Sequence, residues 1–167
     1  MRTAPYGTWT SPITPASLTE GQVRIDEVRI DGPHTWWLES RPWEAGRSAL
    51  IRHDSRTGER HDVLAPPWNV RSRVHEYGGG AYAVDEGVLV FSDFASGRLF
   101  RVSTHERATP LEPTPITPDV AVRYGGLVLH DHHVYAVRED HRRGGEAVNE
   151  LVRLTVDGPN DDCGQVL

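Results

Sequence analysis

His130, Asp131, His132 and His133 follow one another in the second half of the chain and are all of types that bind transition metals. In a β-strand, His130 and His132 would point to the same face, where two imidazoles could share a zinc ion. The sequence offers no further ligand set at zinc spacing, and these residues lie between two apolar runs. We therefore predict a solvated turn and no metal site. A metal-dependent enzyme that uses these histidines is the least favoured of the three functions considered for this chain; the other two are described below.

Three other kinds of chemistry lack the residues that they need. The sequence contains no Lys, which excludes Schiff-base chemistry and a phosphate-binding lysine. The run Gly78-Gly79-Gly80 lacks the spacing of a phosphate-binding loop and favours the tight start of a strand. Neither Ser48 nor Ser96 has the two glycines of a Gly-x-Ser-x-Gly turn. We therefore predict no catalytic residue and no cofactor for this chain.

The charge balance excludes whole classes of partner. The 18 basic residues and 24 acidic residues give a formal net charge of −6. Nucleic acids and anionic membranes bind clustered basic faces, so we expect neither as a partner.

No apolar stretch approaches the roughly 18 residues that a membrane span needs. Because the chain has one cysteine, Cys163, and no apolar run near Arg2 to mark a secretion signal, we predict a cytoplasmic protein.

Short apolar runs bounded by Gly, Pro and Asp follow Gly32 and predict β-strands. They occur in pairs, as the second and third strands of a repeated unit. The pairs are 35–40 with 48–53, 85–93 with 98–103, and 131–139 with 150–155. A Tyr-Gly-Gly triplet stands before each of the last two pairs, starting at Tyr77 and at Tyr124. We expect each triplet to open a strand, because glycine permits close backbone approach there.

The repeated unit has four strands and about 40–50 residues, the size of one propeller blade. We therefore predict an all-β fold, a partial β-propeller of about three four-stranded antiparallel blades. Residues 1–31 are expected to form a short N-terminal extension and residues 32–167 the incomplete propeller. The alternative is another antiparallel sheet with regular hairpins. Because a propeller closes with about four to eight blades and residues 163–167 should begin an outer strand, we expect a part of a longer protein.

Four segments carry a resemblance to a known family. The most specific is residues 69–82, Asn-Val-Arg-Ser-Arg-Val-His-Glu-Tyr-Gly-Gly-Gly-Ala-Tyr. The others are residues 4–13, 37–47 and 137–152. Together they resemble the prolyl oligopeptidase family of serine peptidases, in particular its acylaminoacyl-peptidase and dipeptidyl-peptidase-like branch. The resemblance extends over nearly the whole chain.

The resemblance implies a division of labour between two domains. Family members have a propeller followed by an α/β-hydrolase domain that carries a Ser, Asp and His triad, and the propeller restricts which short peptides reach it. This sequence contains the propeller segments and no hydrolase segment. We therefore expect a substrate-gating domain that is inactive by itself.

The resemblance also suggests where a peptide would bind. Related exopeptidases bind the amino terminus of a peptide with propeller carboxylates, which suggests Glu139 or Asp140 for that contact. The alternative for residues 138–143 is a solvent-facing loop whose charges pair with one another. Glu76 and Arg73 are further candidate substrate-binding residues, with structural ion pairs as their alternative role.

A free-standing module that binds a peptide or a protein is the alternative function for the whole chain. Such a module would need a closed ring, for example from two copies of the three-blade unit. Its size in solution would therefore distinguish it from the gating domain of a peptidase.

Overall fold

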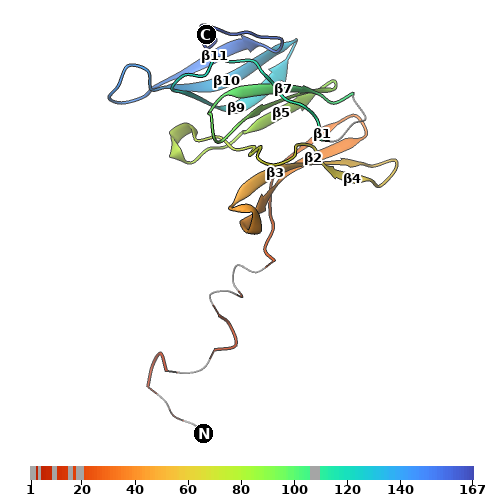
Figure 1. Cartoon of the computed structure of the whole chain (residues 1–167), viewed down its shortest axis with the longest axis vertical. Helices are drawn as coiled ribbons and strands as arrows, with labels where there is room; N and C mark the ends of the chain where they lie inside the picture. Colours follow the sequence, from red (N-terminus) through yellow and green to blue (C-terminus); the bar gives the residue numbers. More distant parts are fainter. Residues whose placement is uncertain (1–2, 4, 9–10, 15–16, 18–20, 106–109) are drawn as a thin grey trace.

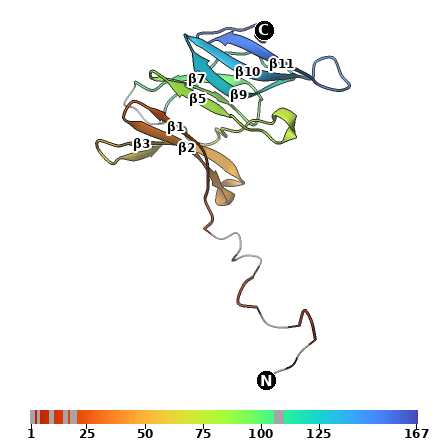
Figure 2. The same cartoon turned by 180° about the vertical axis from the view of Figure 1, so that it is seen from behind.

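The computed structural model describes residues 3, 5–8, 11–14, 17, 21–105 and 110–167. Within these residues, twelve β-strands form three four-stranded antiparallel sheets, each built from strands that are consecutive in the chain. The sheets stack in sequence order, so that the second sheet lies between the first and the third in the front and back views (Figure 1 and Figure 2). The predicted partial propeller of three four-stranded blades is confirmed.

Each blade has a simple up-and-down order of strands. Blade 1 consists of β1 (Arg24–Asp31), β2 (His34–Arg41), β3 (Arg47–Asp54) and β4 (Arg60–Asp62), with the short 3-10 helix η1 (Pro42–Glu44) between β2 and β3. Blade 2 consists of β5 (Tyr82–Asp85), β6 (Val88–Ser92), β7 (Leu99–Ser103) and β8 (Thr114–Pro115), and η2 (Val74–Glu76) precedes it. Blade 3 consists of β9 (Val122–His130), β10 (His133–Asp140), β11 (Val148–Thr155) and β12 (Gln165–Val166). The predicted second and third strands of all three units are therefore present.

β1 lies within residues 1–31, which the sequence analysis placed in an N-terminal extension. It pairs with β2 from Arg24 opposite Ser40 to Asp31 opposite His34, so blade 1 begins before Gly32. The register shifts between Asp26 and Arg29, where Glu27 has a φ of 52°. This bulge breaks the alternation of apolar residues, and β1 is an edge strand whose side chains are mostly exposed. Because of both features, the sequence of β1 lacks the alternation of apolar and polar residues by which the other strands were predicted.

The hydrophobic core lies between neighbouring blades. Trp36 and Leu50 of blade 1 pack with Tyr82 and Phe91 of blade 2 in one buried cluster. Val90 of blade 2 instead packs with a second cluster that includes residues of blade 3. Burying a side chain of this size stabilises the fold by about 1.5–3 kcal/mol. Blade 2 therefore uses both of its faces to hold the other two blades.

Two adjacent tryptophans show how one strand divides its side chains. Trp36 is fully buried in the core between blades 1 and 2. Trp37 points to the opposite face of blade 1, where Arg60 lies 5.4 Å from its ring. This separation follows from strand geometry, because successive side chains of a strand alternate between its faces.

The two Tyr-Gly-Gly triplets occupy different places in their blades. The first lies in the loop before β5, and the second lies inside β9 rather than at its first residue. They nevertheless meet, because the N–H groups of Gly126 and Leu127 donate hydrogen bonds to the carbonyl oxygens of Gly79 and Gly80 at 3.1 Å and 3.0 Å. A Cβ atom on Gly80 would lie 2.5 Å from the Cα atom of Gly126. Only glycine permits this contact between blades 2 and 3.

Replacing Gly80 with alanine is expected to lower the free energy of unfolding by about 3 kcal/mol, because backbone strain and overpacking add. Gly58→Ala is a matched control, since Gly58 also has a positive φ but open space around its Cα. The control is expected to cost only about 1 kcal/mol. Urea unfolding of both variants measures the difference. Equal losses of unfolding free energy in the two variants would show that the close contact between Gly80 and Gly126 adds nothing to the cost of the substitution.

Candidate functional site

The loop of residues 71–80 is held in an unusual conformation at one end of blades 2 and 3. Two non-glycine residues, His75 and Glu76, have φ values of 54° and 61°. The buried Ser72 hydroxyl donates a hydrogen bond to the Tyr124 carbonyl at 2.7 Å and accepts one from the Val74 N–H at 3.1 Å. Positive φ at such residues is strained and persists only where surrounding contacts enforce it. The loop is therefore a preformed support for its exposed side chains.

Glu139 is the buried partner of this loop. Its carboxylate accepts hydrogen bonds from the His75 N–H at 2.6 Å and from Arg123 Nη1 at 3.2 Å, and His141 Nε2 lies 2.6 Å away. Burial would raise the pKa of Glu139, but the His75 N–H, His141 and Arg123 outweigh it, and the pKa lies below its ordinary value. An ionised Glu139 thus joins the loop to β10 in blade 3.

The expectation that residues 138–143 form a solvent-facing loop is wrong for Arg138 and Glu139. Both lie in β10 and both are buried. Arg138 Nη1 donates to backbone carbonyls at the C-terminal end, including that of Gly164 at 3.1 Å, and its Nη2 pairs with Glu150. A run of charges in sequence gives no sign of this, because the partners of Arg138 lie at residues 150–164 and those of Glu139 at residues 75 and 123.

Asp140 lies apart from the loop. Its carboxylate accepts hydrogen bonds from the Arg142 side chain, the shortest at 2.6 Å. The Arg142 side chain lowers the pKa of Asp140 to about 2, against a smaller effect of burial. Asp140 and Arg142 therefore form the local charge pair that the sequence analysis expected of the whole run.

Glu76 is the candidate carboxylate that the structure leaves most accessible. Its side chain is 74% exposed, and Oε1 lies 2.5 Å from Arg123 Nη1. Arg123 also contacts Glu139, so one guanidinium bridges an exposed and a buried carboxylate. The neighbouring Tyr77 is 95% exposed. The structure thus brings Glu76 and Glu139 together through Arg123, a residue that the sequence analysis did not single out.

Arg73 occupies the same loop, but its charge does not join this group. Its carbonyl oxygen accepts a hydrogen bond from Arg123 Nη1 at 3.3 Å, whereas its guanidinium lies 5.2 Å from the ring of Phe94. Arg71 lies 4.9 Å from the same ring. Neither guanidinium has a carboxylate within 4.0 Å among the described residues, so the structural ion pair that was the alternative role of Arg73 is not found there.

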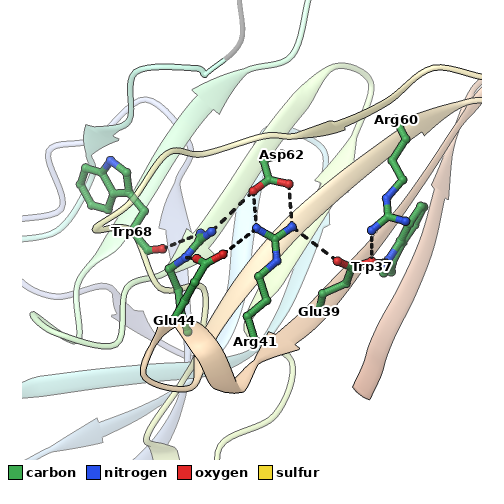
Figure 3. Close-up of polar contacts among 8 residues, drawn as sticks. Trp37, Glu39, Arg41, Glu44, Arg60, Asp62 and Trp68 are labelled. Atoms are coloured by element: carbon green, nitrogen blue, oxygen red, sulfur yellow. Dashed lines mark hydrogen bonds and ion pairs between the residues drawn. The ribbon is translucent and has the colours of Figure 1, made fainter. Parts of the chain in front are cut away.

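A second polar cluster covers the open face of blade 1 (Figure 3). Arg41 makes two hydrogen bonds to the carboxylate of Asp62, at 2.6 Å and 2.7 Å. The pKa of Asp62 lies below its ordinary value because of these bonds, despite partial burial. The cluster contains three acidic and three basic residues, namely Glu39, Glu44, Asp62, Arg41, Arg47 and Arg60.

This cluster is satisfied by its own members. Arg60 pairs with Glu39, whose Oε1 also accepts a hydrogen bond from Trp37 Nε1 at 2.9 Å. The ion pairs share their face of blade 1 with the fully buried Ala49 and Ile51. The alternation of Trp37, Glu39 and Arg41 along β2 was the available sequence signal. Its balanced charges make it a structural surface rather than a binding site.

His130 is the last residue of β9 and His133 is the first residue of β10, and the exposed Asp131 and His132 form the turn between them. Within the described ranges, no group of three or more His, Cys, Asp or Glu side chains is placed to hold a metal ion. No helix in these ranges is long and apolar enough to cross a bilayer.

Glu139→Gln is expected to lower the free energy of unfolding by about 2 kcal/mol at pH 7, because it removes a buried charged acceptor. Since the folded pKa of Glu139 is depressed, its contribution exists above the unfolded pKa and is lost as pH falls through the folded pKa. The variant and the parent chain should therefore converge on acidification. Urea unfolding at pH 7 and below pH 4 tests this, with the exposed Glu146→Gln as control. A loss that is independent of pH would contradict the assigned role.

Comparison with known proteins gives a consistent group of similar structures. No protein-family model matches the sequence, and no curated protein matches it. Among solved structures, the crystal structure of puromycin hydrolase has 31% sequence identity and a TM-score of 0.82. A mutant puromycin hydrolase complexed with PGG gives the same two values. A puromycin-hydrolyzing peptidase of Mycobacterium tuberculosis has 31% identity and a TM-score of 0.80.

Each match covers nearly all of this chain but only a part of the matched peptidase. They extend over 99–100% of this chain but only 27% of each peptidase. Puromycin hydrolase is a prolyl oligopeptidase-family peptidase, and the matching part is its N-terminal domain. In sequence and in fold, the chain is therefore similar to the N-terminal β-propeller portion of puromycin hydrolase, a prolyl oligopeptidase-family peptidase, and it spans about a quarter of the length of that protein.

Proposed function

We propose that this chain is the substrate-gating propeller portion of a prolyl oligopeptidase-like peptidase whose α/β-hydrolase domain lies outside the chain. The observation that carries the proposal is the match over the full chain, at 31% identity, to a puromycin hydrolase. One of the similar structures is complexed with the peptide PGG, which supports short peptides as ligands. In this proposal the protein acts in the cytoplasm.

The catalytic step belongs to the other domain. There a serine would attack the peptide carbonyl, a histidine would transfer the proton, and an aspartate would orient that histidine. The sequence of this chain contains no Gly-x-Ser-x-Gly turn to expose such a serine. The contribution of the propeller is therefore to exclude folded proteins and to bind the part of the peptide that does not react.

Glu76 is the residue that we assign to the amino terminus of the peptide. Glu139 is buried and accepts from three groups, and Asp140 is paired with Arg142, so neither presents a free carboxylate. Glu76 is 74% exposed, and its Oε2 accepts no hydrogen bond from the described residues. Glu76 shares the guanidinium of Arg123 with Glu139, so its second, outward-facing carboxylate oxygen remains to accept from an ammonium group.

The open face of blade 3 gives a reason to expect further blades. Val128 lies opposite Tyr135, and Val137 lies opposite Leu151, all on the face turned away from blade 2. Val128 and Leu151 are 55% and 53% exposed. The open face of blade 1 is instead covered by ion pairs. We propose that the next blade of the longer protein packs on this apolar face of blade 3.

The purified chain is expected to bind a short peptide amide with a free amino terminus, and to release no chromogenic amine from aminoacyl nitroanilides. Glu76→Gln should weaken binding about tenfold, because a charge-assisted contact is lost. Titration calorimetry with the parent chain, Glu76→Gln and Glu146→Gln measures this. Serine-dependent turnover by the parent chain would overturn the gating role. Equal binding by all three proteins would overturn the assignment of Glu76.

The isolated chain is expected to self-associate through the open face of blade 3. Leu151→Glu should shift it toward the monomer, because a charge on this face opposes burial of apolar surface. Ile30→Glu is the control, since Ile30 is 77% exposed but lies on β1. Light scattering coupled to size-exclusion chromatography gives the masses. A uniform dimer that survives Leu151→Glu would instead favour a free-standing interaction module.

A further inference from the structure

Two arginines of the loop at 71–80 share one aromatic ring. Arg71 and Arg73 lie 4.9 Å and 5.2 Å from the centre of the Phe94 ring. They are separated by Ser72, whose side chain is buried against Tyr124, so the two guanidiniums leave the chain on its other side. Packing on an aromatic face orients a guanidinium and leaves its edge of N–H donors free.

Their donors have no acceptor in the described part of the chain. Neither side chain makes a hydrogen bond there, and Arg73 Nε is buried without a partner. Arg123, which contacts this loop, behaves differently, because it pairs with Glu76 and Glu139. Two like charges near one ring repel each other, and a bound anion would lower that repulsion.

The nearest acidic groups do not supply this anion. The carboxylate of Asp93, next to Phe94, accepts hydrogen bonds from the N–H and the hydroxyl of Ser96 within its own turn. Glu76 pairs with Arg123. The local chemistry therefore calls for an external carboxylate, since its two oxygens match the donors of a guanidinium edge.

We infer that Arg71 and Arg73, packed on Phe94, bind the carboxyl terminus of a short peptide. This inference rests on the proposed binding of the peptide amino group by Glu76. Glu76 follows Arg73 by three residues, so this one loop carries side-chain charges of both signs. An extended tripeptide spans only about 10 Å, and its two free termini carry charges of the complementary signs. The loop thereby favours short peptides with both termini free.

The test uses four forms of Gly-Gly-Gly: unmodified, acetylated at the amino terminus, amidated at the carboxyl terminus, and modified at both ends. Titration calorimetry with the parent chain measures each affinity. Amidation is expected to weaken binding about tenfold or more, because charge-assisted hydrogen bonds are lost. Acetylation reports separately on Glu76. A loss on acetylation without a loss on amidation would overturn this inference and leave the role of Glu76 intact.

Variants locate the carboxylate contact. For the Arg71→Gln and Arg73→Gln variants, amidation of the peptide should weaken binding by less than about threefold, because the arginine that would contact the carboxylate is gone. Arg143→Gln is the matched control, because Arg143 is exposed and has no hydrogen bond among the described residues. If Arg143→Gln lowered the effect of amidation as much as the other two variants, the result would reflect the net charge of the protein, and the proposed site would be overturned.

A further measurement does not depend on the stability of Arg73→Gln. Acetate should compete with unmodified Gly-Gly-Gly for the parent chain and should not compete with the amidated peptide. Competition with both peptides or with neither would contradict the inference. Failure of all four peptides to bind would overturn both this inference and the role of Glu76.

Discussion

The close approach of two glycine segments between blades 2 and 3 is the constraint on which the loop at 71–80 depends. The carbonyl oxygens of Gly79 and Gly80 accept hydrogen bonds from Gly126 and Leu127, and no Cβ atom fits between Gly80 and Gly126. The Ser72 hydroxyl adds a bond to the Tyr124 carbonyl. These contacts fix both ends of the loop against β9. The strained conformations of His75 and Glu76 persist because the loop is held on both sides.

Two clusters of charged residues in the molecule have different consequences. On blade 1, three acidic and three basic residues satisfy one another and close the face to further chemistry. Around Glu139, one buried carboxylate is bonded from several sides, while the exposed Glu76 shares only its Arg123. A buried charge without partners is costly, so pairing is required in both places. In the second cluster, the exposed Glu76 has Arg123 as its ion-pair partner and keeps its second carboxylate oxygen toward solvent.

Much of the fold could be predicted from local patterns. Alternating aromatic and β-branched residues between turn residues predicted the second and third strands of each blade, and the opposite faces of Trp36 and Trp37 followed from the same period. β1 was missed because a bulge at Glu27 interrupts its period and its edge position leaves it exposed. The burial of Arg138 and Glu139 was missed for another reason. Their partners, at 150–164 and at 75 and 123, are distant in sequence.

The sequence by itself determined the all-β class, the repeat of four strands and the resemblance to prolyl oligopeptidase-family peptidases, because these depend on period, turn residues and short motifs. The tertiary structure decided which charged residues act together. Glu76, Arg123 and Glu139 come from three separate segments and meet only when blades 2 and 3 pack. Among four candidate residues, burial and pairing then separated the accessible Glu76 from the enclosed Glu139 and Asp140. Solvent access and ion pairing are properties of the packed molecule, and no spacing along the chain specifies them.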